Sequence, residues 1–114
     1  MTAREIATLI QGEILSGEAY MDETQSYAFA SDLMSDVLTI KIDDFVLITG
    51  LANIQSIRTA EMSDVKCVLL VRGKKATEDM VALARENGMI LMQTPFSMFK
   101  TSGLLFNAGL SPVY

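Results

Sequence analysis

Three unbroken apolar runs stand out in the second half of the chain, at residues 45–48, 67–71 and 89–92. Each run is followed within two residues by glycine or a polar residue, which marks its end. An apolar run of this length is typical of a strand that is buried on both faces of a parallel sheet. The pattern therefore predicts three central strands, whose spacing of about 22 residues fits one strand and one helix per repeat.

Helical patterns separate these strands. Apolar residues recur at helical spacing over 54–60 and 77–84, and a last helix is predicted over 97–107. The order of strands and helices, with short connections, predicts an α/β fold in which a mainly parallel sheet lies between two helical layers. With no linker or low-complexity tract, residues 1–114 are expected to form one domain.

The first half of the chain has weaker patterns. Thr2 and Glu5 have the spacing of a capping box, so they predict a helix at the N-terminus. A short strand is predicted at 13–16, ended by Gly17, and alternating residues predict another strand at 26–30. A short helix is then expected, with Ser31 or Asp32 as its N-cap.

Composition excludes several classes of protein. Half of the residues are apolar, which excludes disorder, and the net charge of -5 argues against a nucleic-acid partner. Histidine is absent and Cys67 is the single cysteine, so we expect no iron–sulfur cluster, no zinc and no other cofactor. Because the sequence offers no nucleophile–base pair either, we expect no enzyme.

No segment reaches the ~18–20 apolar residues that a membrane span needs. The first residues are polar and lack the apolar core of a signal peptide. We therefore expect a cytoplasmic protein without a membrane partner.

A candidate ligand site lies where the central strands end, because open parallel sheets bind ligands beyond the carboxyl ends of their strands. Basic side chains and free backbone N–H groups there could hold a phosphate or carboxylate. In the alternative interpretation, the hydroxyl and amide side chains only cap helices and the basic loop is solvated. The candidate residues are Thr49, Gly50, Asn53, Arg72, Gly73, Lys75, Thr94 and Ser97.

Two other chemically distinctive groups predict no site. Cys67 begins an apolar strand and is expected to be a buried, inert thiol. Asp43 and Asp44 precede a strand, at the edge of the sheet away from the expected ligand edge, so we interpret them as a solvated turn.

The last predicted helix is apolar on more than one side, and a helix of this kind needs burial on several sides. We favour association of two copies over the alternative, a pocket for a hydrophobic ligand. The residues expected at the interface of this homodimer are Met98, Phe99, Leu105 and Phe106.

The chain resembles the DRTGG domain, a small α/β module found beside CBS domains in some pyrophosphatases and in phosphotransacetylases. Residues 45–50, 68–75 and 92–101 carry the resemblance. The family's Asp-Arg pair, which follows the first of these strands, is missing here, and its Thr-Gly-Gly is reduced to Val71-Arg72-Gly73. The resemblance implies that any ligand role of this pair is either lost or rebuilt with Arg72 and Lys75.

The resemblance also implies a fold like that of the N-terminal domain of HPr kinase. It favours a non-enzymatic regulatory or oligomerisation module that acts as a homodimer, with a further protein partner unidentified. The alternative function is a sensor that binds a nucleotide or another phosphate-bearing metabolite at the carboxyl ends of the central strands.

Overall fold

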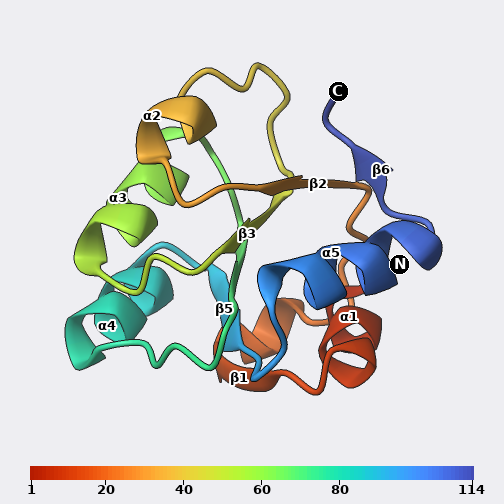
Figure 1. The fold of residues 1–114 in the computed structure, drawn as a ribbon. Coiled ribbons are helices and arrows are strands. Elements are labelled where there is room, and N and C mark those ends of the chain that lie inside the picture. The colour runs from red at the N-terminus through yellow and green to blue at the C-terminus, as the bar shows by residue number, and fades with distance from the viewer.

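A six-stranded sheet forms the centre of the computed structural model, which describes residues 1–114 (Figure 1). The strand order is β1-β5-β4-β3-β2-β6. All neighbouring pairs are parallel except β1 with β5, which is antiparallel. The strands are β1 (Glu13–Ser16), β2 (Tyr27–Ala30), β3 (Val46–Thr49), β4 (Cys67–Leu70), β5 (Ile90–Gln93) and β6 (Ser111–Pro112).

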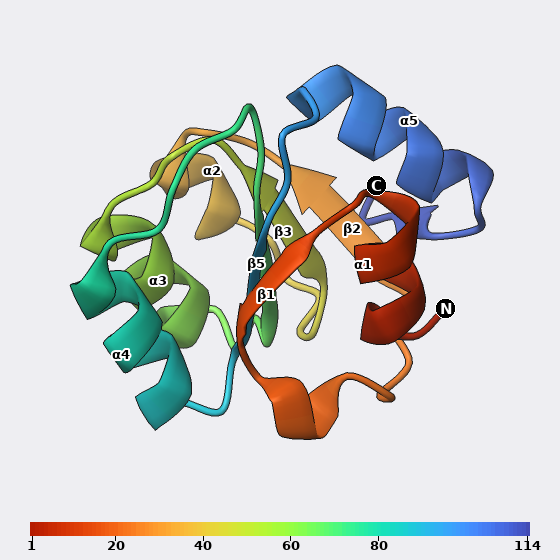
Figure 2. The same ribbon diagram turned by 90° about the horizontal axis from the view of Figure 1, so that it is seen from below.

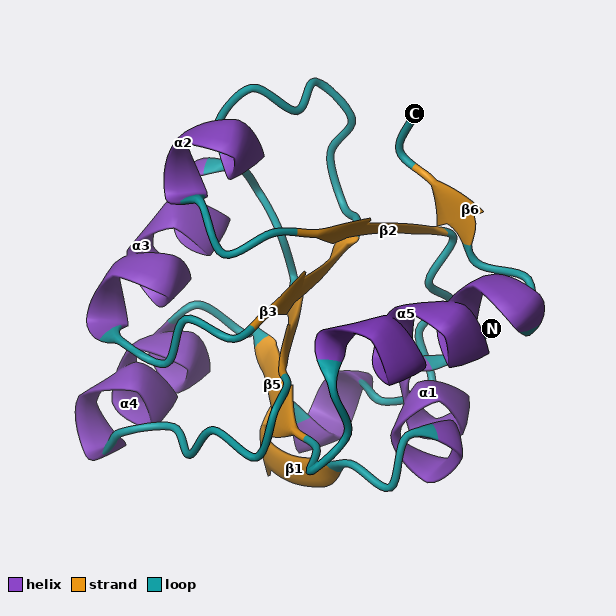
Figure 3. Ribbon diagram, in the orientation of Figure 1, coloured by secondary structure: helices purple, strands orange, loops and turns teal.

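Helices cover both faces of this sheet. Helices α2, α3 and α4 lie on one face, and α1 and α5 lie on the other (Figures 2 and 3). The predicted three-layer α/β/α fold with a mainly parallel sheet is therefore confirmed. The helices are α1 (Ala3–Leu9), α2 (Met34–Val37), α3 (Ile54–Met62), α4 (Glu78–Glu86) and α5 (Met98–Asn107), with a short 3-10 helix, η1 (Glu18–Tyr20).

The core is divided in two by the sheet. Successive residues of a strand point to opposite faces, so Val46 and Ile48 pack beneath α1 and α5, while Leu47 packs beneath the other three helices. Strands β3, β4 and β5 are buried along their whole length. This double burial explains why the sequence of the central strands is apolar without alternation.

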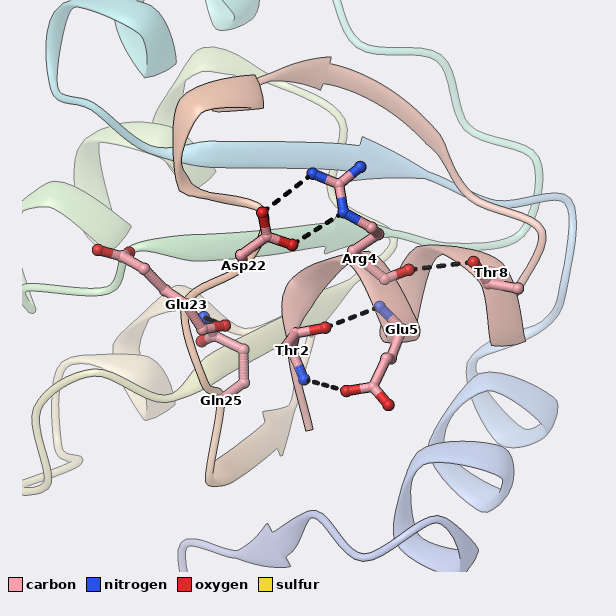
Figure 4. Close-up of polar contacts among 7 residues, drawn as sticks. All are labelled: Thr2, Arg4, Glu5, Thr8, Asp22, Glu23 and Gln25. Atoms are coloured by element: carbon pink, nitrogen blue, oxygen red, sulfur yellow. Dashed lines mark hydrogen bonds and ion pairs between the residues drawn. The ribbon is translucent and has the colours of Figure 1, made fainter.

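Thr2 and Glu5 form the predicted capping box at the start of α1 (Figure 4). The backbone N–H of Thr2 donates to the Glu5 carboxylate at 2.8 Å, and this bond lowers the pKa of Glu5. Next to it, Arg4 forms an ion pair with Asp22 at 2.9 Å between nitrogen and oxygen (Figure 4). These contacts fix α1 and the segment after η1 at one corner of the molecule.

The prediction that Ser31 or Asp32 caps a helix was wrong. Helix α2 begins at Met34, and its N-cap is Leu33, which makes no side-chain capping bond. The Ser31 hydroxyl accepts the N–H of Leu33 at 3.0 Å instead, in a local turn. The carboxylate of Asp32 turns away from α2 toward the end of β3.

The chain ends by returning to the far edge of the sheet. Helix α5 leads from β5 to β6, which pairs with β2 through Tyr27 opposite Ser111. Neither β6 nor η1 was predicted, because neither has an apolar repeat. None of the helices combines the length and the apolar character that crossing a bilayer would require.

Candidate functional site

Strands β2, β3, β4 and β5 end at one edge of the sheet, and the candidate ligand residues lie there or in the segments that follow. We call this edge the carboxyl edge. The parallel pairing of these strands places Thr49 beside Leu70, and Leu70 beside Gln93. The residues that follow each strand therefore meet, although they are about 20 residues apart in sequence.

Arg72 occupies a tight turn at the end of β4. Both Arg72 and Gly73 have positive φ, 65° and 70°, and the N–H of Lys74 donates back to Val71 at 3.3 Å. The N–H of Arg72 donates to the carbonyl oxygen of Phe96 at 2.7 Å. A left-handed backbone is uncommon for a residue with a side chain, so the surrounding hydrogen bonds hold Arg72 in an unfavourable conformation.

The guanidinium of Arg72 lies against Gly50, at the end of β3. A Cβ atom at Gly50 would be 2.2 Å from Nη2 of Arg72, so only glycine leaves room for this arrangement. Nη2 also donates to the carbonyl oxygen of Gly50 at 3.4 Å. Glycine is therefore needed at position 50 because it lets the guanidinium approach the backbone closely, and not because of an unusual φ.

Asp32 completes this group, although the sequence predicted it only as a helix cap. Its Oδ1 accepts the N–H of Gly50 at 2.6 Å and the hydroxyl of Thr49 at 3.1 Å. Its Oδ2 lies 3.1 Å from Nη1 of Arg72. A backbone amide, a hydroxyl and a guanidinium thus meet at one carboxylate, which comes from the segment after β2.

Three other candidate residues use their side chains for structural hydrogen bonds. Thr94 is buried, and its hydroxyl donates to the carbonyl oxygen of Ile10 at 2.6 Å. Asn53 and Ser97 are the N-caps of α3 and α5. The structure therefore brings Thr49, Gly50 and Arg72 together, while these three stabilise neighbouring elements.

Lys74 and Lys75 follow Arg72 and are exposed, and neither forms an ion pair with an acidic side chain. They line a polar cavity of about 200 Å³ next to the turn. Gly73 and Thr94 line it too, and Glu13 supplies one carboxylate. The turn after β4 thus carries three positive side chains within four residues, on a chain whose net charge is -5.

The second candidate surface is apolar and lies where α5 crosses β2 and β6. Phe99 is 90% exposed and Phe106 is 67% exposed. Both line a groove of about 340 Å³, whose floor includes the buried residues Leu105 and Ile48. We call this surface the α5 groove. Of the four residues predicted at an interface, the two phenylalanines are therefore exposed, Met98 is half-buried and Leu105 belongs to the core.

The remaining titratable groups differ in burial. Burial raises the pKa of the Cys67 thiol to about 12, and the nearby Asp44 carboxylate adds to the shift, so the thiol is unreactive near neutral pH. Asp43 and Asp44 are exposed and line a wide polar cavity of about 740 Å³ at the opposite edge of the sheet. No group of three or more acidic or cysteine side chains is arranged to hold a metal ion.

Comparison with solved structures finds the same fold in the CBS and DRTGG domains of the regulatory region of Clostridium perfringens pyrophosphatase, in complex with the activator diadenosine tetraphosphate. The TM-score is 0.73 at 16% sequence identity, over 91% of this chain and 45% of that chain. This chain therefore spans a little under half of the length of its structural neighbour. In that protein the DRTGG domain is part of a regulatory module.

Sequence comparison leads to the same family. Comparison with curated protein sequences finds no match. The family model of the DRTGG domain, in contrast, matches residues 5–108, which include the carboxyl edge and all of α5. Because this match covers almost the whole chain and the fold agrees with it, the protein belongs to the DRTGG domain family.

Proposed function

We propose that the chain is a non-enzymatic regulatory domain that acts as a homodimer, and that two copies associate through the α5 groove. The observation that carries this proposal is the exposure of Phe99 and Phe106, two turns apart on α5, along one apolar groove. Burying one exposed phenylalanine side chain stabilises a complex by roughly 1.5–3 kcal/mol. Symmetry would double that gain.

A second copy is the occupant that fits this surface. A twofold interface brings the same patch together from both subunits, so the patch must supply both the protruding and the receiving groups. The α5 groove does so, because its rim has exposed phenylalanines and its floor has Ile48, Leu105 and Leu110. No lysine, arginine or carboxylate side chain lines the groove, so pairing would leave no buried charge.

Sedimentation velocity at tens of micromolar tests the homodimer. We expect the wild type to sediment as a dimer and Phe99→Glu to sediment as a monomer with an unchanged circular dichroism spectrum, because Phe99 makes little contact with its own core. The matched control is Met62→Glu, which charges a side chain that is 70% exposed on α3, across the sheet. A monomeric wild type, or equal dissociation by both variants, would contradict the proposal.

A second candidate function is a sensor for a nucleotide or another phosphate-bearing metabolite at the carboxyl edge. The guanidinium of Arg72 and the unpaired charges of Lys74 and Lys75 support it. The structural neighbour, which was solved with a dinucleotide activator, makes nucleotides the first compounds to test.

Thermal unfolding with adenine nucleotides and sugar phosphates tests the sensor. A ligand at a hundredfold excess over its dissociation constant stabilises the folded state by about 2.7 kcal/mol. Arg72→Gly removes the guanidinium and suits the positive φ of this turn, so it should abolish the response without adding strain. If no compound stabilises the wild type, the sensor function has no support.

A further inference from the structure

We propose that Thr49, Gly50 and Arg72 form a binding site for a phosphate monoester, and that the carboxylate of Asp32 is the built-in occupant that this ligand displaces. The proposal deepens the second candidate function and rests on it. It concerns what fills the site in the free protein and which chemical group replaces that occupant.

The donors that surround Asp32 are those that bind anions. One carboxylate accepts the N–H of Gly50 at 2.6 Å and the hydroxyl of Thr49 at 3.1 Å, and it lies 3.1 Å from the guanidinium of Arg72. A guanidinium with neighbouring N–H and O–H groups matches the geometry of phosphate oxygens as well as that of carboxylate oxygens. The side chain of Asp32 thus shows where an anionic group is held.

The backbone that carries these donors is fixed without the help of Asp32, and the guanidinium of Arg72 keeps its hydrogen bond to the carbonyl oxygen of Gly50 at 3.4 Å. Thr49 and Gly50 lie at the end of β3, which is buried. The turn of Arg72 is held by backbone bonds to Phe96 at 2.7 Å and, through Gly73, to Thr94 at 3.1 Å. A ligand would therefore meet preorganised donors after Asp32 leaves, which lowers the cost of binding.

Asp32 itself is weakly held, apart from its carboxylate. Its backbone N–H and carbonyl oxygen make no hydrogen bond within the protein. The helix that follows, α2, has four residues and lacks a side-chain cap. The Asp32 side chain is 41% exposed, so one side of it already faces solvent.

The charge around the site favours a phosphate monoester over a carboxylate. Asp32 carries one negative charge, which Arg72 alone neutralises. Lys74 and Lys75 follow directly and are exposed, and neither forms an ion pair, although the Glu13 carboxylate lines the same cavity as both lysines. A phosphate monoester, which carries nearly two negative charges, would gain more from this positively charged turn than a second carboxylate would.

Amide NMR spectra recorded during titration with inorganic phosphate and with ribose 5-phosphate test the proposal. We compare the wild type with Asp32→Ala and Asp32→Asn, and use Asp22→Ala as the control. Asp22 is also a carboxylate in an exposed ion pair, with Arg4, so its loss changes the net charge equally at another place. A tethered carboxylate competes at an effective concentration on the order of millimolar or above. We therefore expect Asp32→Ala to bind ribose 5-phosphate at least ten times more tightly than the wild type.

Binding should shift the amide signal of Gly50 in the wild type and in Asp32→Ala, and Asp22→Ala should bind with the affinity of the wild type. The side-chain carboxyl carbon signal of Asp32 gives a readout without substitution, because saturating ligand should move it toward the value of a solvated aspartate. Asp32→Asn, which keeps the side-chain shape, provides the comparison if Asp32→Ala is unfolded.

The possible failures are distinguishable. If the wild type binds in a way that needs Arg72 but Asp32→Ala and Asp32→Asn bind no more tightly than Asp22→Ala, the built-in occupant is refuted and the sensor survives. If no protein in the series binds either compound, the site and the sensor function both fail. If inorganic phosphate binds as tightly as ribose 5-phosphate, the site recognises only the anion, which overturns the proposal that its ligand is a phosphate monoester.

Discussion

Gly103 offers a substitution that should strengthen folding and weaken association at the same time. It lies inside α5 and lines the α5 groove, and a Cβ atom there would meet no atom within 4 Å. In a helix interior, glutamine is more favourable than glycine by about 0.5 kcal/mol. For a domain of this size that gain corresponds to a rise of about 2–4 °C in the melting temperature of the monomer.

In the dimer the same glutamine would lie between the two copies. Burying one such amide without a hydrogen-bond partner costs about 1–3 kcal/mol, so the two copies together cost about 2–6 kcal/mol, which weakens association by roughly 30-fold or more. Gly103→Ala is the matched control, since it has the helical gain without the polar group.

Two measurements on the same samples separate these effects. Thermal unfolding at submicromolar concentration follows the monomer, and sedimentation at tens of micromolar follows the dimer. We expect Gly103→Gln to melt higher and to dissociate, and Gly103→Ala to melt higher and to remain associated. A Gly103→Gln protein that stays fully dimeric would refute the placement of the interface on the α5 groove. A lower melting temperature would refute the open space around Gly103.

Three further predictions concern stability and reactivity. Gly17→Ala should destabilise the protein far more than Gly73→Ala, a difference in unfolding free energy that denaturant titration measures. Both glycines have positive φ, but a Cβ atom at Gly17 would lie 2.6 Å from the backbone of β5, whereas a Cβ atom at Gly73 would meet no atom within 4 Å. Cys67 should not react with a thiol reagent at pH 8 until the chain is unfolded, because burial raises its pKa to about 12, and a rapid reaction in the folded state would contradict this. Hydrogen bonds lower the pKa of Glu5 and of Asp22 below their ordinary values of 4.5 and 3.8. The two ionised carboxylates therefore stabilise the folded state at pH values above their ordinary pKa, and the melting temperature should fall as the pH drops below about 4.5.

The central elements could be predicted because local sequence determines them. Strands β3, β4 and β5 need only a short apolar run, and the caps Thr2 and Thr77 need only one side chain and the backbone that follows it. Strand β6 could not be predicted, because its two residues pair with β2 only after α5 has brought the chain back across the sheet.

The sequence predicted the place of the anion donors but not their arrangement. Gly50 and Arg72 were candidates because each follows a strand that ends at the carboxyl edge. Asp32 was missed as their partner, since an acidic residue before a short helix is more typical of a cap. Its contact with Arg72 spans 40 positions and depends on the order of strands in the sheet, which no local pattern contains.

The two helical layers differ in how the chain assembles them, and this has a consequence for the order of folding. Strands β2 to β5, with α2, α3 and α4, form one uninterrupted stretch in which each strand pairs with the next along the chain. The layer of α1 and α5 instead unites the two ends of the chain, so it closes a much longer loop. We expect amide hydrogens in α1, α5 and β6 to exchange with solvent before those of β3 and β4. If a second copy packs on α5, it should slow hydrogen exchange most in the layer of α1 and α5, whose contacts are the most distant in sequence.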